Sequence, residues 1–349
     1  MVGISLLTLV PGIVGGSETY VRELCRALAR RGRMELTAFV PTIAADAADG
    51  LPSRVITGYR ASYSPAGRVR AMARAAARPR PLRRELGVDQ LDAIHFPLSV
   101  MLPPVERTPA VTTILDLQHE FLPHNFGRAE RMYRQVAYGR AAKRSRIVIA
   151  ISEHARTTLV DRLGLGPERV RAIHLAVDHE RFTPADVPRE PFLLYPANPW
   201  PHKNHATLFR ALELLPELRL VLTGSGHDGR PLPARAEALG RVSQTELVDL
   251  YRRAAALVFP SLYEGFGQPA LEALACACPA AVSDLPPLRE VCGDAAVYFD
   301  PTDPESIAAG VRETLARGGA AGPARAAPFT WDACAARHEE VYRELIVAA

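Results

Sequence analysis

Residues 256–277 read ALVFPSLYEGFGQPALEALACA and contain the strand, loop and helix on which the fold prediction rests. The apolar run Ala256–Phe259 is typical of a buried strand, and the apolar spacing over Pro269–Ala277 is typical of a helix. Proline suits the first turn of a helix, because the N–H that it lacks has no intrahelical acceptor there. Gly265 and Gly267 follow the carboxyl end of the strand, where open α/β sheets bind ligands.

The same alternation of apolar runs and helical patterns extends over the whole chain. We expect strands at Gly3–Leu9, Glu35–Val40, Ala93–Phe96, Val111–Leu115, Arg146–Ile151, Phe192–Tyr195, Arg219–Thr223, Ala256–Phe259 and Ala280–Ser283. We expect helices at Thr19–Arg31, Gly67–Leu86, Ala129–Lys143, Ser152–Leu163, Asn204–Leu215, Gln244–Ala254, Pro269–Ala277, Pro304–Ala316 and Trp331–Val347. Strands that alternate with helices form parallel sheets covered by helices, so the predicted fold class is α/β, doubly wound and Rossmann-like.

The length of 349 residues favours two domains. We expect one domain over residues 1–177, a proline-containing linker over 178–191 and a second domain over 192–330, with the ligand in the cleft between the domains. A last helix follows over 331–349. The Gly/Ala/Pro-rich tract Gly318–Pro328 before it is predicted to be flexible.

The composition predicts a globular protein, since 48% of the residues are hydrophobic and 23% are charged. No apolar stretch approaches the roughly 18 residues of a membrane span, and the apolar N-terminus lacks the basic start of a signal peptide. We therefore expect a cytoplasmic location. The five cysteines form no CxxC pair, which favours buried thiols over a zinc site or disulfides.

The two halves of the chain differ in net charge, which is +11 for residues 1–175 and −7 for residues 176–349. A basic half can attract nucleic acid, anionic lipid or a phosphorylated substrate. Residues 67–86 contain seven arginines, which fits either a weak peripheral contact with an anionic membrane at its inner face or a solvated helix. The shortage of large apolar residues there favours the solvated helix.

The first domain has a glycine-rich loop, PGIVGGSE, at residues 11–18. Gly15 and Gly16 directly precede an expected helix, whose N-terminus offers free N–H groups to an anion. The loop matches neither GxGxxG nor the P-loop, so a tight turn and a phosphate cradle remain equally open.

Polar residues also follow the strand Val111–Leu115, in the stretch DLQHE at residues 116–120. Asp116 or His119 could act as a base or orient a sugar hydroxyl, and the alternative is a hydrogen-bonded, capped loop. The spacing of His119, Glu120 and His124 does not fit an HExxH metal motif.

The second domain has two candidate loops. The first, YPANPWPHKNH at residues 195–205, contains Lys203 next to an expected helix start, where a cation and the helix dipole would both favour a diphosphate. The second loop contains Glu264 and is followed by Glu272 in the helix, so that two carboxylates could accept from sugar hydroxyls. A glycosidase acid–base pair is the alternative, and the neighbouring anion site makes it less favoured.

The spacing of Glu264 and Glu272 resembles the EX7E motif of retaining glycosyltransferases of family 4, which have the GT-B fold. The motifs GGSETY at residues 15–20, VLTGSG at residues 221–226 and GRV at residues 240–242 resemble the family pattern in order and spacing. The resemblance covers nearly the whole chain. It implies two Rossmann-like domains that face a central cleft, with a C-terminal helix that packs back on the N-terminal domain.

The resemblance also implies roles for individual residues. In the transfer reaction, Glu264 would contact the transferred sugar, Lys203 the diphosphate, and Asp116 and His119 the region beside the sugar. The donor nucleotide-sugar would be bound by Gly15, Gly16, Asn198, His202, Gly224, Arg241, Val242, Phe266, Gly267, Gln268 and Glu272. Among these, Glu272 would accept from the ribose hydroxyls, and Arg241 and Val242 would border the base.

The chain departs from the family pattern at two places. Ala197 and Asn198 stand where the family usually has an arginine, so the diphosphate loses one cation, for which His202 could compensate. Leu115 stands where the family often has a histidine, which leaves Asp116 and His119 as the candidates in that loop.

The sequence contains no DxD motif, so we expect metal-independent transfer and no cofactor. The resemblance implies transfer of a mannose- or rhamnose-like hexose from a nucleotide-sugar to a saccharide, lipid-linked or small-molecule acceptor, with no nucleic-acid partner. The alternatives are a GT-B phosphorylase with pyridoxal phosphate, a GT-B sugar-nucleotide epimerase and a non-catalytic nucleotide-sugar-binding protein. Neither Lys143 nor Lys203 fits the lysine that pyridoxal phosphate needs.

Overall fold

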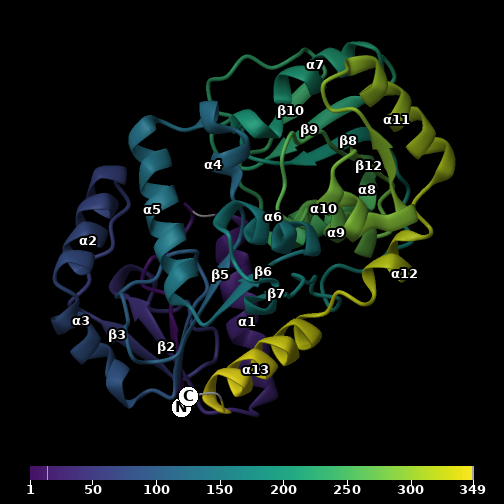
Figure 1. The fold of residues 1–349 in the computed structure, drawn as a ribbon. Helices are drawn as coiled ribbons and strands as arrows, with labels where there is room; N and C mark the ends of the chain where they lie inside the picture. The colour runs from purple at the N-terminus through teal and green to yellow at the C-terminus, as the bar shows by residue number, and fades with distance from the viewer. Residues whose placement is uncertain (14, 348–349) are drawn as a thin grey trace. The chain divides into compact units, whose positions relative to one another are not determined.

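The computed structural model describes residues 1–13 and 15–347. The chain divides into two compact units (Figure 1). Unit 1 contains Met1–Leu175 together with the chain from Trp331 onward, and unit 2 contains Ala176–Thr330.

Unit 1 is built on a parallel sheet with the strand order β3-β2-β1-β4-β5-β6-β7. Its strands are β1 (Val2–Ser5), β2 (Leu36–Pro41), β3 (Ser53–Ile56), β4 (Ala93–Phe96), β5 (Ala110–Ile114), β6 (Ile147–Ala150) and β7 (Val170–Ala172). Its helices are α1 (Gly16–Arg31), α2 (Pro65–Ala77), α3 (Pro79–Leu86), α4 (Gln118–Phe121), α5 (Arg128–Arg144), α6 (Glu153–Leu163) and α13 (Trp331–Val347). The strand order reverses between β1 and β4, as in doubly wound folds.

Unit 2 has a parallel sheet with the strand order β10-β9-β8-β11-β12-β13. Its strands are β8 (Glu190–Pro196), β9 (Arg219–Thr223), β10 (Ala236–Ala238), β11 (Ala254–Phe259), β12 (Ala280–Ser283) and β13 (Val297–Phe299). Its helices are α7 (His205–Glu213), α8 (Gln244–Arg253), α9 (Gln268–Ala275), α10 (Pro286–Cys292), α11 (Pro304–Arg317) and α12 (Gly322–Ala326). Both units are Rossmann-like, which confirms the predicted fold class.

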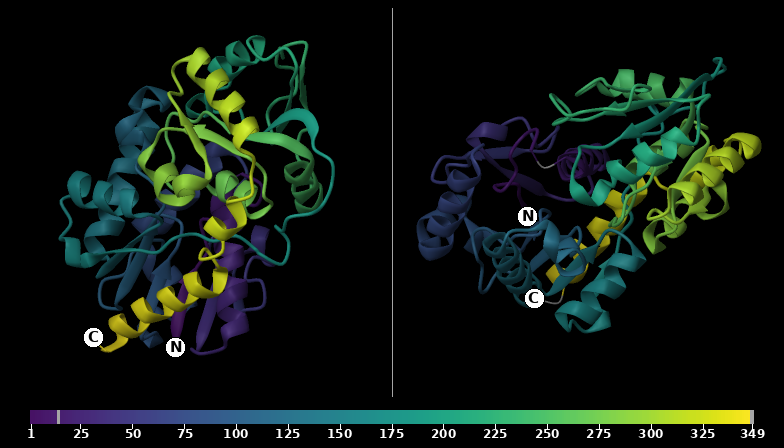
Figure 2. Two further views of the ribbon diagram at one scale, coloured as in Figure 1. Left: turned by 90° about the vertical axis from the view of Figure 1, so that its right-hand side faces the viewer. Right: turned by 90° about the horizontal axis from the view of Figure 1, so that it is seen from above.

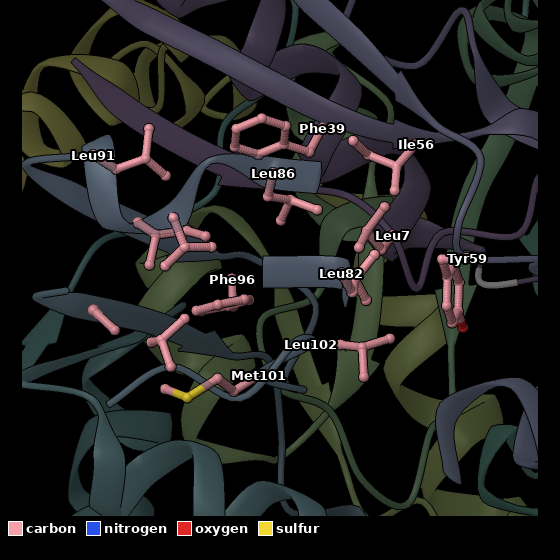
Figure 3. Packing of buried hydrophobic residues seen from close by; sticks show 14 of the residues in the cluster. Leu7, Phe39, Ile56, Tyr59, Leu82, Leu86, Leu91, Phe96, Met101 and Leu102 are labelled. Carbon is pink, nitrogen blue, oxygen red and sulfur yellow. The ribbon is translucent and has the colours of Figure 1, made fainter. Parts of the chain in front are cut away.

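The core of unit 1 includes a cluster in which strands and helix α3 contribute side chains to one apolar layer. Figure 3 shows Phe39 of β2 and Phe96 of β4 with Leu82 and Leu86 of α3. These side chains are at most 4% exposed, and burial of a large apolar side chain contributes about 1.5–3 kcal/mol. The helix α3 is therefore held to the sheet by its leucines, while Arg80 and Arg84 are exposed.

The C-terminal helix α13 belongs to unit 1, where it packs along α1 (Figure 2). Arg31, in the last turn of α1, donates to Asp332 at 2.7 Å and to Glu339 at 3.1 Å. Glu339 is 1% exposed, so this pair joins the two helices in the interior. The end of the chain thus returns to the unit in which the chain begins.

The structure differs from the sequence prediction in three segments. Residues 67–86 form two helices, because Pro79 interrupts the backbone hydrogen bonds after Arg78. The expected linker 178–191 lies inside unit 2, where Phe182 is buried and Arg189 donates to the Ala254 carbonyl at 2.7 Å. The tract 318–328 contains α12, which packs on α9 and is therefore ordered rather than flexible.

Candidate active site

The loop between β11 and α9 is shaped by Gly267. This residue is the N-cap of α9 and has φ +106°, a left-handed conformation that favours glycine. A Cβ atom there would lie 2.4 Å from Cδ2 of Leu288, so a larger residue would clash. Gln268 and Pro269 begin α9; Pro269 has no N–H, and the Ala270 N–H donates to the Gly267 carbonyl at 3.0 Å. Of the first three helical residues, Gln268 is therefore the one whose backbone N–H could face an anion.

Lys203 and Glu264 come together from two different loops of unit 2. Nζ of Lys203 lies 2.5 Å from Oε1 of Glu264, and the two side chains are only 13% and 12% exposed. Nζ also lies 5.2 Å from the centroid of the Phe259 ring, within cation–π range. The pair places a cation and a carboxylate at the carboxyl ends of the adjacent strands β8 and β11.

The loop that contains Lys203 is fixed by hydrogen bonds to its surroundings. Leu262 donates its N–H to the His202 carbonyl at 2.7 Å, and the Tyr195 hydroxyl donates to the Lys203 carbonyl at 2.7 Å. Asn204 has φ +58° and donates from Nδ2 to the carbonyls of Pro260 and Pro301. Sequence reasoning missed these supporting roles of Tyr195 and Asn204. A polar residue directly before a helix was the available signal for Asn204.

His202 does not supply the positive charge that the family pattern would place here. Burial, together with the neighbouring Lys203, lowers the pKa of His202 to about 3. The imidazole is therefore neutral near pH 7 and can offer a hydrogen bond but no charge. That His202 compensates for the missing arginine stays a prediction, and in this structure the imidazole would do so through a hydrogen bond rather than through charge, chiefly because it is buried.

Glu272 lies in a buried polar cluster at the first turns of α9. Oε2 of Glu272 lies 3.0 Å from the Tyr251 hydroxyl, and Nε2 of Gln268 donates to Oε1 at 3.4 Å and to the Ala176 carbonyl at 2.9 Å. Burial raises the pKa of Glu272 to about 7. Tyr251, on α8, was not among the predicted residues, because nothing in the sequence relates that helix to α9.

The glycine after β9 packs against the loop after β8. Gly224 has φ +119°, and a Cβ atom there would lie 2.6 Å from Oδ1 of Asn198. The same oxygen accepts from the N–H of Ser225 at 2.7 Å. Asn198, which the sequence predicts to bind the donor, therefore holds the turn at Gly224 and Ser225, and this contact uses one acceptor site of its amide oxygen.

The other predicted donor-binding residues of unit 2, Arg241, Val242 and Phe266, range from exposed to fully buried. Gly224 donates its N–H to the Gly240 carbonyl at 2.8 Å. This hydrogen bond places the turn that contains Arg241 and Val242 beside the turn at Gly224. Arg241 is exposed and Val242 is half-buried. Phe266 is only 2% exposed and packs edge-on against Phe329, so its side chain belongs to the core.

In unit 1, the glycine loop leads directly into α1. Gly15 is the N-cap with φ +55°, and a Cβ atom on Gly16 would meet nothing within 4 Å. Oε2 of Glu18 accepts from the N–H of Gly12 at 2.7 Å, which closes the loop. Space beside Gly16 and the N-terminus of a 16-residue helix are compatible with an anion. Val14, within the predicted motif, lies outside the described residues.

Asp116 and His119 lie in the short segment that follows β5. Oδ1 of Asp116 accepts from the N–H of Gln118 at 2.9 Å, which caps the turn before α4. His119 is 1% exposed, stands edge-on to Tyr138 with a centroid distance of 5.4 Å, and has its pKa lowered by burial. Its Nδ1 has no hydrogen-bond partner among the described residues. The structure thus places His119 behind the loop surface, in an aromatic pocket.

The described part of the chain has neither a candidate metal cluster nor a candidate membrane span. Over residues 1–13 and 15–347, no group of three or more His, Cys, Asp and Glu side chains is arranged to hold a metal ion. Within the same residues, no helix is long and apolar enough to cross a membrane. All five cysteines are buried free thiols, as their scattered positions predicted.

Comparisons with known proteins agree with this architecture. Residues 14–181 match the model of Glycosyltransferase Family 4, and residues 177–325 match that of Glycosyl transferases group 1. The chain is 28% identical to the O-antigen chain mannosyltransferase B of Escherichia coli. The aligned 295 residues cover 74% of this chain and 76% of that protein. It is 30% identical to a D-inositol 3-phosphate glycosyltransferase of Xylanimonas cellulosilytica, over 95% of this chain and 92% of that protein.

Two solved structures have a similar fold. The sucrose-phosphate synthase of Thermosynechococcus elongatus has a TM-score of 0.79 at 20% identity, over 100% of this chain and 99% of that one. The Anabaena protein HepE, solved with UDP and glucose, has a TM-score of 0.73 at 16% identity, over 98% of this chain and 99% of that one. Fold, family models and relatives agree, and the chain belongs to the family 4 glycosyltransferases with the GT-B fold.

Proposed function

We propose that this glycosyltransferase transfers a mannose- or rhamnose-like hexose from a nucleotide-sugar to a hydroxyl group, with retention of configuration and without a metal. The acceptor would be a saccharide, a lipid-linked sugar or a natural product. The observation that carries the proposal is the Lys203–Glu264 pair, 2.5 Å apart and largely buried beside the start of α9. The mannosyltransferase among the relatives supports the choice of sugar.

The residues of unit 2 suit a nucleoside diphosphate linked to a sugar. Lys203 and the backbone N–H of Gln268 at the start of α9 would hold the diphosphate, since a cation and a helix N-terminus both favour negative charge. Glu264 would accept from hydroxyls of the hexose, and Glu272 from the ribose. Arg241 and Val242 would border the base. The relative HepE was solved with UDP and with glucose, which is the same class of ligand.

In the proposed reaction, the acceptor oxygen forms a bond to the anomeric carbon on the face from which the diphosphate leaves. The bond between that carbon and the phosphate oxygen breaks, and the acceptor proton goes to the departing phosphate. No strong protein base is required. Lys203 would stabilise the charge that grows on the diphosphate, and Asp116 of unit 1 would orient the sugar or the acceptor. His119, which is 1% exposed, would support that segment from behind.

A screen of the purified protein against nucleotide-sugars tests this function. We expect release of nucleoside diphosphate with a mannose or 6-deoxyhexose donor and an added acceptor, and a product whose anomeric configuration matches the donor. Binding of a nucleotide-sugar with no turnover would favour the non-catalytic alternative. Interconversion of the sugar within the intact donor would favour an epimerase.

We propose in addition that α2 and α3 make only a weak, electrostatic contact with anionic membranes. Leu82 and Leu86 are buried, and the sulfur of Met72 accepts a hydrogen bond from the Tyr133 hydroxyl. Among the larger apolar residues of the segment 67–86, this leaves Val69, which is 55% exposed, to insert into a membrane. Arg70 and Arg74 are exposed. We expect the protein to co-sediment with anionic vesicles at low salt and not at high salt. The double variant Arg70→Glu, Arg74→Glu should bind these vesicles more weakly. Equal binding to zwitterionic vesicles would contradict the proposal.

A further inference from the structure

A chain of hydrogen bonds runs through the interior of unit 1, between the C-terminal helix and the sheet. Five side chains form this buried polar chain, namely Tyr342, His95, Thr113, Tyr20 and His338. Each of them is at most 1% exposed. They come from β4, β5, α1 and α13: β4 pairs with β5, and α13, from the other end of the sequence, packs on α1 and β4.

The direction of every hydrogen bond in the buried polar chain follows from one carbonyl group. Nδ1 of His338 lies 2.8 Å from the Cys334 carbonyl, which can only accept, so Nδ1 carries the proton and Nε2 is an acceptor. The Tyr20 hydroxyl, 3.0 Å from Nε2, must donate to it. Tyr20 therefore accepts at its own oxygen, and Thr113, 3.0 Å away, is the donor.

The same reasoning continues to the other end. Because the Thr113 hydroxyl donates to Tyr20, its oxygen accepts from Nε2 of His95 at 2.8 Å. Nδ1 of His95 is then the acceptor for the Tyr342 hydroxyl, also at 2.8 Å. Every proton in the buried polar chain is used once, and both imidazoles are neutral. Burial lowers the pKa of His338 to about 4 and holds the pKa of His95 well below its usual value, which agrees with this arrangement.

The buried polar chain touches both segments of unit 1 that carry candidate site residues. Tyr20 lies one helical turn after Gly16 on α1, and Thr113 lies three residues before Asp116 on β5. The backbone around Thr113 is also fixed, since Ser99 donates its N–H to the Thr113 carbonyl at 2.9 Å and accepts from the N–H of Leu115 at 3.2 Å. The glycine loop before α1 and the segment that contains Asp116 are thus both attached to the same buried polar chain.

We propose that Tyr20, Thr113, His95, His338 and Tyr342 are positioning residues, through which the C-terminal helix holds the glycine loop and the Asp116 segment in the geometry that transfer requires. The proposal rests on the proposed function for its catalytic consequence. Because small errors in the placement of reacting groups cost rate, loss of a link should lower kcat more than it lowers affinity for the nucleotide.

Two adjacent threonines of β5 provide a matched test. Thr112 and Thr113 are both 0% exposed and both hydrogen-bonded, but the Thr112 hydroxyl pairs with Ser145 at 2.7 Å, outside the buried polar chain. Thr113→Val and Thr112→Val should lower Tm by similar amounts. We expect kcat to fall roughly tenfold in Thr113→Val only, with unchanged affinity for nucleoside diphosphate, and to recover in Thr113→Ser, which keeps the hydroxyl. Equal kcat values for the two valine variants would overturn the proposal.

Hydrogen exchange supplies a readout that does not depend on turnover. Tyr342→Phe, on α13, should speed amide exchange in both residues 15–20 and residues 113–119, whereas Thr112→Val should not. If the wild-type protein turned over no donor while this pattern appeared, the proposed function would fail and the structural coupling would stand. Exchange confined to α13 in Tyr342→Phe would overturn the coupling itself.

Discussion

The main polar groups of the two units differ in charge and in exposure to solvent. In unit 2, the charged pair Lys203 and Glu264 is largely buried but keeps 13% and 12% of its side-chain surfaces exposed to solvent. In unit 1, the buried polar chain is neutral, and its members are at most 1% exposed. Burial of a charge is costly, whereas a neutral group can be buried fully when each donor has an acceptor. We therefore expect unit 2 to stabilise charge and unit 1 to hold reacting groups in position.

The largest effect should come from removal of the cation in unit 2. We expect Lys203→Ala to lower turnover by at least ~100-fold, on the scale of one lost transition-state contact, with a smaller effect on donor affinity. Lys203→Arg should be intermediate, because the longer, forked group keeps the charge but misplaces it. Steady-state kinetics and nucleotide titration measure the two quantities.

The neighbouring histidine is the control for that experiment. His202→Ala removes a neutral imidazole, so its effect should be much smaller than that of Lys203→Ala. Near-normal turnover in Lys203→Ala with a large loss in His202→Ala would mean that the two roles are reversed.

A second test separates the two carboxylates of unit 2. Glu272→Ala should weaken the binding of free nucleoside diphosphate roughly tenfold, through lost hydrogen bonds to the ribose. Glu264→Ala should chiefly remove turnover, because its partner would be the transferred sugar. Calorimetric titration with nucleoside diphosphate distinguishes them, and equal losses of affinity in both variants would refute the division.

A third test concerns the pH dependence of stability. The pKa of Glu272 rises from 4.5 to about 7 on folding, so its contribution to stability is complete below about pH 4.5 and is lost as the pH rises through 7. Glu272→Gln cannot ionise, and we expect it to be more stable than wild type at pH 8, by at most about 3 kcal/mol, and similar at pH 4.5. Thermal unfolding at both pH values is the measurement; a gain that is equal at both would contradict a titrating Glu272.

The smallest effect expected is that of a chelator. Because the sequence has no DxD motif, EDTA should leave turnover unchanged. The rate of nucleoside diphosphate release with and without EDTA is the measurement. Activity that EDTA abolishes and Mg²⁺ or Mn²⁺ restores would show that unit 2 needs more positive charge than Lys203 and the helix termini supply.

The inner strands of both sheets could be predicted from the sequence, but the four edge strands could not. The segments Arg219–Thr223 and Ala280–Ser283 were located correctly because a buried strand is a continuous apolar run between turn residues. The edge strands β3, β7, β10 and β13 are as short as several inner strands but are paired on one side only, and β3 and β7 have one buried residue each while β10 has none. Without a continuous buried apolar run, their sequences carry too weak a pattern to be recognised.

The sequence by itself determined the α/β architecture, the family and the loops in which the candidate residues lie, because these depend on local periodicity and on short motifs. Only the tertiary structure decided which of these residues meet. It joined Lys203 to Glu264 across 61 positions and Tyr20 to His338 across 318. It also decided charge, since His202 is neutral because of its burial beside Lys203. Contact, burial and pKa depend on atoms that the chain brings together only when it folds, so no local pattern could reveal them.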